Sequence, residues 1–274
     1  MVIGGRAFDT ANKCYIMGIL NMTPDSFSDG GKWKTRDAAF CHAESMIRDG
    51  ADIIDVGGES TRPGHISISE QEEIDRAIPV IESLHVRFDA PISIDTYKSG
   101  VADAALSAGA VLVNDIWGLK RDRKMAGLIA RSGAACCLMH NKNDNNIEYV
   151  NFMRELSDSL KESVELAKNA GITADRIILD PGVGFAKNYE MDLEVINRLD
   201  VIAQLGYPVM LGASRKRVVG TALGLPVTER IEGSLATTVV AVMRGCSFVR
   251  VHDVKETKRA ITMTEAILRV NVQN

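Results

Sequence analysis

Polar side chains that follow short apolar runs are the first residues in this sequence that could do chemistry. Three of them, Asp95, Asn114 and Asp180, offer carboxylate and amide oxygens. Such acceptors suit the edge of a planar heterocycle that presents several N–H donors, and an asparagine can also donate a hydrogen bond. These residues therefore predict a site for a nitrogen heterocycle such as a pterin or a purine.

A second group of residues in similar positions combines cations with hydroxyls. Its members are Arg62, Lys216, Arg250, His252, Ser60, Thr61 and Ser214. Arginine holds phosphate through two parallel hydrogen bonds, so this group predicts a phosphate or pyrophosphate site. The net charge of -4 argues against nonspecific nucleic-acid binding, so an anionic ligand must be met by such a local cluster.

Two long glycine-containing stretches complete the polar set. They read "NMTPDSFSDGG" (21–31) and "GGESTRPG" (57–64). Long loops beside a site often close over substrate and exclude water. We expect the first to be a lid anchored at Asn21, with Gly30-Gly31 as its far hinge.

Eight apolar runs must position these residues. They lie at 15–20, 51–56, 90–95, 110–115, 134–140, 176–182, 207–214 and 247–253. Each is nearly continuously apolar, which is typical of parallel strands buried on both faces. The adjacent Cys136 and Cys137 should point to opposite faces of one strand.

Amphipathic segments separate the runs, and the clearest are 35–50 and 151–171. Eight strands alternating with helices predict an α/β fold, a (β/α)8 TIM barrel, as one domain over residues 1–274. Residues 1–13 carry turn signals, and we expect a short β-hairpin there that plugs the bottom of the barrel. The acidic stretch 69–76 is expected to be a solvated first helical turn.

The barrel prediction gives the polar residues a common location, because active sites in this fold lie at the carboxyl ends of the strands. A single Asp or Thr after a strand often only caps the next helix, and Asp95-Thr96 taken alone would be read that way. Polar residues after all eight runs exceed what capping needs. They predict a functional site at the carboxyl ends of the strands, the mouth of the barrel.

The bulk properties exclude other classes of protein. The 274 residues are 46% hydrophobic and 25% charged, as in ordinary soluble globular proteins. No apolar run approaches the roughly 20 residues of a membrane span. The five cysteines lack metal-ligand spacing, so we expect them to pack in the core of a cytoplasmic protein.

Seven motifs together resemble those of the dihydropteroate synthase family of pterin-binding enzymes. In order along the chain they are "NMTPDSFSDGG", "DVGGESTRPG", "SIDTYK", "NDIWG", "DPGVGF", "GASRK" and "RVHDV". They cover residues 21–254, and the first two are too long for a chance match. The resemblance implies a barrel that joins 6-hydroxymethyl-7,8-dihydropterin pyrophosphate to p-aminobenzoate, giving 7,8-dihydropteroate and pyrophosphate. It further implies Mg2+ as cofactor, competition by sulfonamides and a homodimer, with 235–243 as a candidate interface segment.

The resemblance also assigns roles to individual residues. It places pterin on Asp95, Asn114, Met139, Asp180, Phe185 and Lys216. It places pyrophosphate on Asn21, Thr61, Arg62, Arg250 and His252, with Mg2+ near Asn21. It places p-aminobenzoate beside Phe27, Thr61, Pro63, Arg215 and Lys216. The catalytic residues are then Asp95, Lys216 and Arg250.

Two segments depart from the family pattern. After His140 the family usually has a loop with Gly and Pro, whereas this chain has "NKNDNNIEYVN". Ala186 and Asn188 stand where Gly and Thr are common, and we expect both to be tolerated.

Two other functions could use similar acceptors. A pterin-binding methyltransferase acting with a corrinoid protein would need no pyrophosphate site. A non-catalytic pterin binder would show eroded loops or cations, and this sequence keeps both.

Overall fold

The barrel strands form one parallel sheet whose ends meet. The computed structural model describes residues 1–22, 32–60, 67–142 and 147–270, with backbone only for 32–36. The strands are β3 (Tyr15–Asn21), β4 (Ile53–Gly57), β5 (Ile92–Asp95), β6 (Leu112–Asp115), β7 (Ala135–Met139), β8 (Ile177–Asp180), β9 (Met210–Leu211) and β10 (Phe248–Val251). Their order is β8-β7-β6-β5-β4-β3-β10-β9. A parallel bridge between Leu179 and Val209 closes the ring, so the predicted (β/α)8 barrel is confirmed.

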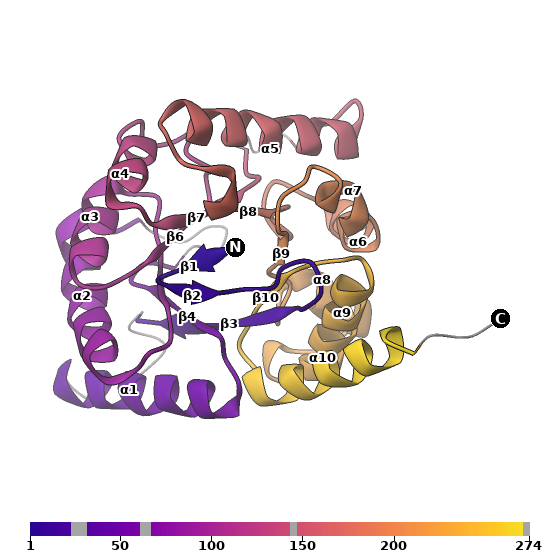
Figure 1. The fold of residues 1–274 in the computed structure, drawn as a ribbon. Coiled ribbons are helices and arrows are strands. Elements are labelled where there is room, and N and C mark those ends of the chain that lie inside the picture. The colour runs from indigo at the N-terminus through magenta and orange to yellow at the C-terminus, as the bar shows by residue number, and fades with distance from the viewer. Residues whose placement is uncertain (23–31, 61–66, 143–146, 271–274) are drawn as a thin grey trace.

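Helices surround this ring (Figure 1). They are α1 (Lys32–Asp49), α2 (Glu70–Arg87), α3 (Ser99–Ser107), α4 (Met125–Ser132), α5 (Phe152–Asn169), α6 (Tyr189–Asn197), α7 (Leu199–Ala203), α8 (Arg217–Leu223), α9 (Ile231–Met243) and α10 (Val254–Leu268). Short 3-10 turns, η2 (Ala174–Arg176) and η3 (Val227–Glu229), precede β8 and α9. Side-chain caps start several helices: Ser69 accepts from the Glu72 amide, and Asn151 accepts from that of Arg154.

The predicted N-terminal hairpin is present. Strands β1 (Val2–Ile3) and β2 (Arg6–Ala7) pair antiparallel and cross the centre of the ring in Figure 1. Buried Ile3 and Phe8 join a core cluster with barrel residues that include Met17, Ile53 and Phe248. The hairpin therefore fills the bottom of the barrel.

That cluster identifies the inward faces of the strands. Its strand members include Met17, Ile53, Leu112, Cys137, Ile178, Met210 and Phe248. Side chains two positions further along each strand point the same way, so the next inward layer contains the polar Asp55, Asn114, Asp180 and Arg250. Cys136 belongs to the other, outer core cluster, which confirms the opposite orientations predicted for the cysteine pair.

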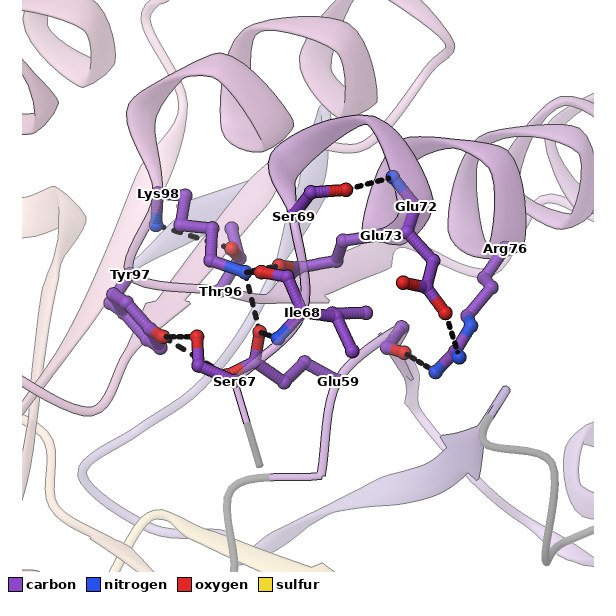
Figure 2. Close-up of polar contacts among 11 residues, drawn as sticks. Glu59, Ser67, Ile68, Ser69, Glu72, Glu73, Arg76, Thr96, Tyr97 and Lys98 are labelled. Atoms are coloured by element: carbon purple, nitrogen blue, oxygen red, sulfur yellow. Dashed lines mark hydrogen bonds and ion pairs between the residues drawn. The ribbon is translucent and has the colours of Figure 1, made fainter. Parts of the chain in front are cut away.

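The prediction for the acidic stretch 69–76 was only partly right. Ser69 does cap α2, and Glu72 remains on the surface side. Glu73, however, is buried and pairs with Lys98 at 2.8 Å (Figure 2). A cation supplied from another element offsets the cost of burying this carboxylate, and a pattern within one helix cannot reveal that partner.

Candidate active site

Two carboxylates and one amide, from three neighbouring strands, surround one arginine inside the ring. Arg250 of β10 donates from Nε to Asp55 Oδ2 at 2.6 Å and from an Nη to Asp95 Oδ2 at 2.7 Å. Asn114 donates from Nδ2 to Asp55 Oδ2 at 3.2 Å. The cluster thus joins β4, β5, β6 and β10 at the level above the apolar barrel core.

Burial sets the electrostatics of this cluster. Asp95 is 3% exposed, and burial raises its pKa to about 7, with Arg250 opposing the shift and Asp55 adding to it. Burial alone would lower the pKa of Arg250, but Asp55 and Asp95 outweigh it and the pKa is raised. Oδ1 of Asp55 and Oδ1 of Asp95 are buried and accept no hydrogen bond. Two carboxylate oxygens are therefore left for a donor that the described residues do not supply.

Asp180 and Lys216 face the same space from the other side of the ring. A β-carbon on Gly212 would lie 3.7 Å from both Asp180 Oδ2 and Lys216 Nζ, and 3.9 Å from Arg250 Cβ. Burial lowers the pKa of Lys216 to about 8 although Asp180 and Asp95 favour its charged form. A glycine at this point leaves room between the carboxylate and the two cations.

Asn21 lies beside the Asp95 end of the cluster. A β-carbon on Gly57 would lie 3.5 Å from Asn21 Oδ1 and 3.9 Å from Asp95 Oδ2. The last residue of β3 therefore presents an amide oxygen next to the carboxylate, as the strand-end argument predicted.

Met139 and Phe185 form an apolar wall with neighbours from adjacent loops. Met139 belongs to a small buried cluster with Tyr97 and Ile116, against which Trp117 and Phe185 pack. Lys216 Nζ lies 4.8 Å from the Phe185 ring centroid and donates to the Val183 carbonyl at 2.7 Å. The two residues on which the resemblance places the pterin are thus brought to the same mouth.

His252 and Arg215 lie further out along the rim. His252 Nδ1 is 3.1 Å from the Ser214 hydroxyl. Arg215 pairs with Asp253 through two hydrogen bonds, and its backbone has a positive φ of 57°. The Arg215 guanidinium is therefore held by Asp253 at the edge of the mouth. The predicted roles of Phe27, Thr61, Arg62 and Pro63 concern positions outside the described residues.

Sequence reasoning missed Asp55, which anchors Arg250. Asp55 is fully buried in the middle of an apolar run, so the local pattern indicates only that it belongs to a strand. The parity of the strand carried a signal, because Asp55 lies two positions after the inward Ile53 and pairs in register with Ser93, two before Asp95.

Lys187 is a second residue that the sequence did not mark. Its buried Nζ lies 2.9 Å from His140 Nδ1 and donates to the carbonyl oxygens of Gly182 and Phe185 at 2.9 and 3.0 Å. Burial lowers the pKa of Lys187 to about 7, and burial together with Lys187 lowers that of His140 to about 2. Neutral His140 can accept from Lys187, which fixes the loop that carries Phe185.

The family departures also have structural consequences. Asn188 caps α6 by accepting from the Met191 amide at 2.8 Å, as a threonine could, so its tolerance is explained. Ala186 adopts a φ of 45°, which favours glycine. In the atypical segment after His140, Tyr149 donates its hydroxyl to the Ala186 carbonyl at 2.9 Å.

The described residues offer few ligands for a metal ion. No group of three or more His, Cys, Asp or Glu side chains among them could hold a metal ion. Mg2+, however, keeps several waters and often binds through one or two protein oxygens plus substrate phosphates. The amide oxygen of Asn21 fits such a shared ion.

No helix in the described part of the chain is long and apolar enough to cross a bilayer.

This chain is similar to known proteins over nearly its whole length. Residues 17–252 match the family model described as "Pterin binding enzyme". The chain is 55% identical over 270 residues to the dihydropteroate synthase of Clostridium beijerinckii, covering 98% of this chain and all of that protein.

Solved structures agree with the sequence relatives. A dihydropteroate synthase from Clostridium difficile, crystallised with pteroic acid, has a TM-score of 0.93 and 49% identity, and the alignment covers 96% of this chain and 100% of the other. The Yersinia pestis dihydropteroate synthase with a sulfonamide drug has a TM-score of 0.92 and 40% identity, with coverage of 98% and 99%.

Proposed function

The chain belongs to the dihydropteroate synthase family of pterin-binding enzymes, and we propose how its barrel mouth carries out that family's condensation. It is a transferase that joins 6-hydroxymethyl-7,8-dihydropterin pyrophosphate to p-aminobenzoate in folate synthesis. The observation that carries the mechanism is the pair of buried, unpartnered carboxylate oxygens on Asp55 and Asp95.

The pterin occupies the space between Asp95, Asn114 and Asp180. A pterin ring edge presents several N–H groups, which match these acceptors. As the bond from the pterin methylene to pyrophosphate breaks, positive charge spreads into the ring. A carboxylate fixed in a dry site stabilises this developing cation without reorganising, and Asp95 is buried in the required way.

The leaving pyrophosphate lies toward Arg250 and His252, with Asn21 at the end of the neighbouring strand β3. Arg250 supplies a fixed cation, and the Ser214 hydroxyl orients the His252 ring through Nδ1. Mg2+, when bound, would neutralise pyrophosphate charge, and Asn21 Oδ1 would hold it together with the phosphate oxygens. Thr61 and Arg62 are proposed to add phosphate contacts.

The second substrate, p-aminobenzoate, is proposed to lie beside Phe27, Thr61, Pro63, Arg215 and Lys216. Its aryl amine is neutral and attacks the pterin methylene without a strong base, so no nucleophile-activating triad is needed. Because a sulfonamide is bound in the Yersinia pestis relative, we expect sulfonamides to compete with p-aminobenzoate here. A corrinoid-dependent methyltransferase would have no use for a pyrophosphate site at Arg250 and His252.

We also propose a cytoplasmic homodimer. The five cysteines are free and four are buried, which suits a reducing compartment. Exposed apolar side chains gather on the C-terminal helices, including Met243, Met263 and Ile267, and the predicted interface segment 235–243 lies in α9. Analytical ultracentrifugation would give the oligomeric state directly.

A coupled assay tests the proposal. Purified protein is given pterin pyrophosphate and p-aminobenzoate, with and without Mg2+, and both dihydropteroate and pyrophosphate are measured. Equimolar formation of the two products, lost when Mg2+ is chelated and restored by adding it back, is expected. Synthesis that is unchanged by chelation would remove Mg2+ from the proposal while leaving the condensation in place.

A further inference from the structure

The turn between β8 and α6 lies beside the proposed pterin site, and side chains with no part in the mechanism above hold it. It covers residues 181–187, begins directly after the acceptor Asp180, and carries Phe185. Three of its residues have positive φ angles: Gly182 (71°), Gly184 (84°) and Ala186 (45°). Glycine tolerates such angles, but an alanine there is strained and needs support from its surroundings.

Lys187 supports the turn from the inside. Its side chain is buried, and its Nζ donates to the carbonyl oxygens of Gly182 and Phe185 at 2.9 and 3.0 Å. The third contact of Nζ is His140 Nδ1 at 2.9 Å. Burial and Lys187 lower the pKa of His140 to about 2, so its neutral ring can accept this hydrogen. All three donors of the ammonium are thus used to join the turn to the end of β7.

The same contacts hold the pterin acceptor Asp180. The Gly182 amide donates to Asp180 Oδ1 at 2.7 Å, and the Gly182 carbonyl is one of the two that Lys187 holds. A β-carbon on Gly182 would lie 2.2 Å from the His140 carbonyl oxygen and 3.2 Å from Met139 Cγ, so the turn packs directly on the end of β7. Lys187 therefore fixes the residue whose amide orients the Asp180 carboxylate.

Tyr149 supports the turn from the outside, at the strained residue. Its hydroxyl donates to the Ala186 carbonyl at 2.9 Å, and its ring packs edge-on against Phe152 of α5 with the centroids 5.0 Å apart. Tyr149 belongs to the segment after His140 that departs from the family pattern, and Ala186 is another departure. One hydrogen bond therefore joins the two departures, which indicates that the tyrosine compensates for the missing glycine.

We propose that Lys187 and Tyr149 are positioning residues for the pterin. They act by holding the turn 181–187, so that the Asp180 carboxylate and the Phe185 ring keep their places beside the substrate. Lys187 holds the two ends of this turn from inside the barrel wall, and Tyr149 holds it from the side of α5. This inference rests on the proposed placement of the pterin at Asp180 and Phe185.

Stability alone does not account for the buried lysine. Other contacts already hold the α6 side of the turn: the Gly184 amide donates to Asp192 Oδ1 at 2.7 Å, and Arg217 donates to the Lys187 carbonyl at 3.1 Å. Burial of the ammonium is unfavourable, and it lowers the pKa of Lys187 to about 7. Since an apolar side chain would avoid this penalty, the lysine is explained by the specific geometry that it fixes.

Separate binding measurements on the two halves of the first substrate test the proposal. Lys187→Met removes the ammonium and keeps most of the stem, and Tyr149→Phe removes one hydroxyl and keeps the ring. Calorimetry gives the affinity of each variant for a pyrophosphate-free pterin and, with Mg2+ present, for inorganic pyrophosphate.

The two ligands should respond differently. Pterin affinity should fall about tenfold in Lys187→Met and about threefold in Tyr149→Phe, the orders expected for losing several buried hydrogen bonds or one. Pyrophosphate affinity should change less than about twofold, because the proposed pyrophosphate contacts on β3 and β10 do not belong to the turn.

Matched controls come from the same chain. Lys120→Met and Tyr15→Phe repeat the two side-chain changes at positions where no pterin contact is proposed. Asp52→Ala removes the acceptor of the Ile16 amide and so destabilises the hairpin end of the barrel. All three should keep the affinities of the unmodified enzyme for both ligands. Thermal unfolding of every variant, compared with Asp52→Ala, identifies binding losses that come from stability alone.

Each outcome decides between explanations. Lowered melting temperatures with unchanged pterin affinity in Lys187→Met and Tyr149→Phe would make these contacts purely structural and overturn the inference. Equal losses of affinity for pterin and for pyrophosphate would do so as well. If Lys187→Met does not fold, Tyr149→Phe decides by the same two criteria.

Asp180→Asn, run in parallel, separates this inference from the assignments on which it rests. Weakened pterin binding there supports the proposed place of the pterin. Unchanged pterin binding would overturn that place and this inference with it, whereas absence of synthesis by the unmodified enzyme would overturn the proposed function.

Discussion

Two buried clusters in this barrel contain the same charges but differ in how their atoms are satisfied. Inside the ring, Asp55 and Asp95 share Arg250. Behind the end of β4, Glu59 and Glu73 share Lys98. In the first cluster, each carboxylate keeps one buried oxygen without a hydrogen bond. In the second cluster, no described side-chain nitrogen or oxygen is both buried and without a hydrogen-bond partner.

The difference separates a binding site from its support. Among the described residues, buried side-chain N or O atoms without a partner occur in Asp55, Ser93, Asp95 and Asp192, and the first three lie together on the inner face of β4 and β5. An unsatisfied buried polar group costs about 1–3 kcal/mol, so it is retained where a ligand completes it. A saturated network gains nothing from a ligand and instead fixes the geometry around it.

Removing charge from the unsatisfied cluster should have the largest effect. Asp95→Asn keeps the size and acceptor of the side chain but loses the charge that stabilises the pterin cation. We expect kcat to fall by about a hundredfold or more, the size typical of losing one preorganised electrostatic contact. Pterin affinity should fall much less, because the ground state carries little positive charge. Steady-state kinetics with equal kcat in both enzymes would remove Asp95 from this role.

Removing the shared cation should have the next largest effect. Arg250→Ala should weaken binding of pterin pyrophosphate by roughly 1.5–3 kcal/mol, and that of a pyrophosphate-free pterin by less. It should also destabilise the fold, because breaking a buried ion pair typically costs about 3–5 kcal/mol. Calorimetry on folded protein, with Arg250→Lys as the comparison that keeps a charge, measures both. If the two ligands were weakened equally, Arg250 would act on the pterin ring instead.

The pH dependence of stability and of kcat/KM should distinguish the two clusters by a smaller effect. Burial raises the pKa of Asp95 to about 7, whereas an aspartate in an unfolded chain titrates near 4. The folded protein therefore holds this proton more tightly. The resulting stabilisation is full below about pH 4 and is lost as pH rises to about 7. Because the charged form is the active one, kcat/KM should fall as pH drops below about 7.

Two measurements check this prediction. A pH–rate profile should show the acidic limb, and denaturant unfolding of Asp95→Asn should lose the corresponding decline in stability between about pH 4 and 7. A rate that stays constant through this range would mean that Asp95 is charged well below neutrality.

The smallest expected effect concerns backbone strain beside the site. Ala186 holds a φ of 45°, and an alanine there costs about 1 kcal/mol more than glycine. Ala186→Gly should raise the free energy of unfolding by up to about 1 kcal/mol, less the entropy that glycine adds to the unfolded chain. Ala266→Gly, at an exposed position of α10, is the control and should lower the free energy of unfolding by about 0.5–1 kcal/mol. Urea unfolding in which both changes destabilise equally would contradict strain at position 186.

The sequence predicted what depends on local pattern. All eight strands were found because buried parallel strands are short apolar runs, and polar residues at their ends followed from the fold. Asn21, Asp95, Asn114, Asp180 and Arg250 were found in this way. The family resemblance added Met139 and Phe185 as expected pterin contacts.

The remaining residues depend on contacts between distant segments. Asp55 matters because it meets Arg250, 195 positions away, and nothing near Asp55 shows this. Glu73 looked solvated because its helix is acidic, but Lys98 of α3 lets it be buried. Lys187 likewise depends on His140 of a different loop. Buried charges that are paired across elements are invisible to patterns within one element.

A single-turnover experiment compares the two clusters side by side. Pyrophosphate release is followed in a single turnover, at saturating pterin pyrophosphate and p-aminobenzoate, for the unmodified enzyme, Asp95→Asn and Glu73→Gln. We expect Glu73→Gln to release pyrophosphate at a rate close to that of the unmodified enzyme, and Asp95→Asn to release it about a hundredfold more slowly although substrate is bound. Release at the unmodified rate by Asp95→Asn, or equal slowing in both variants, would contradict this expectation.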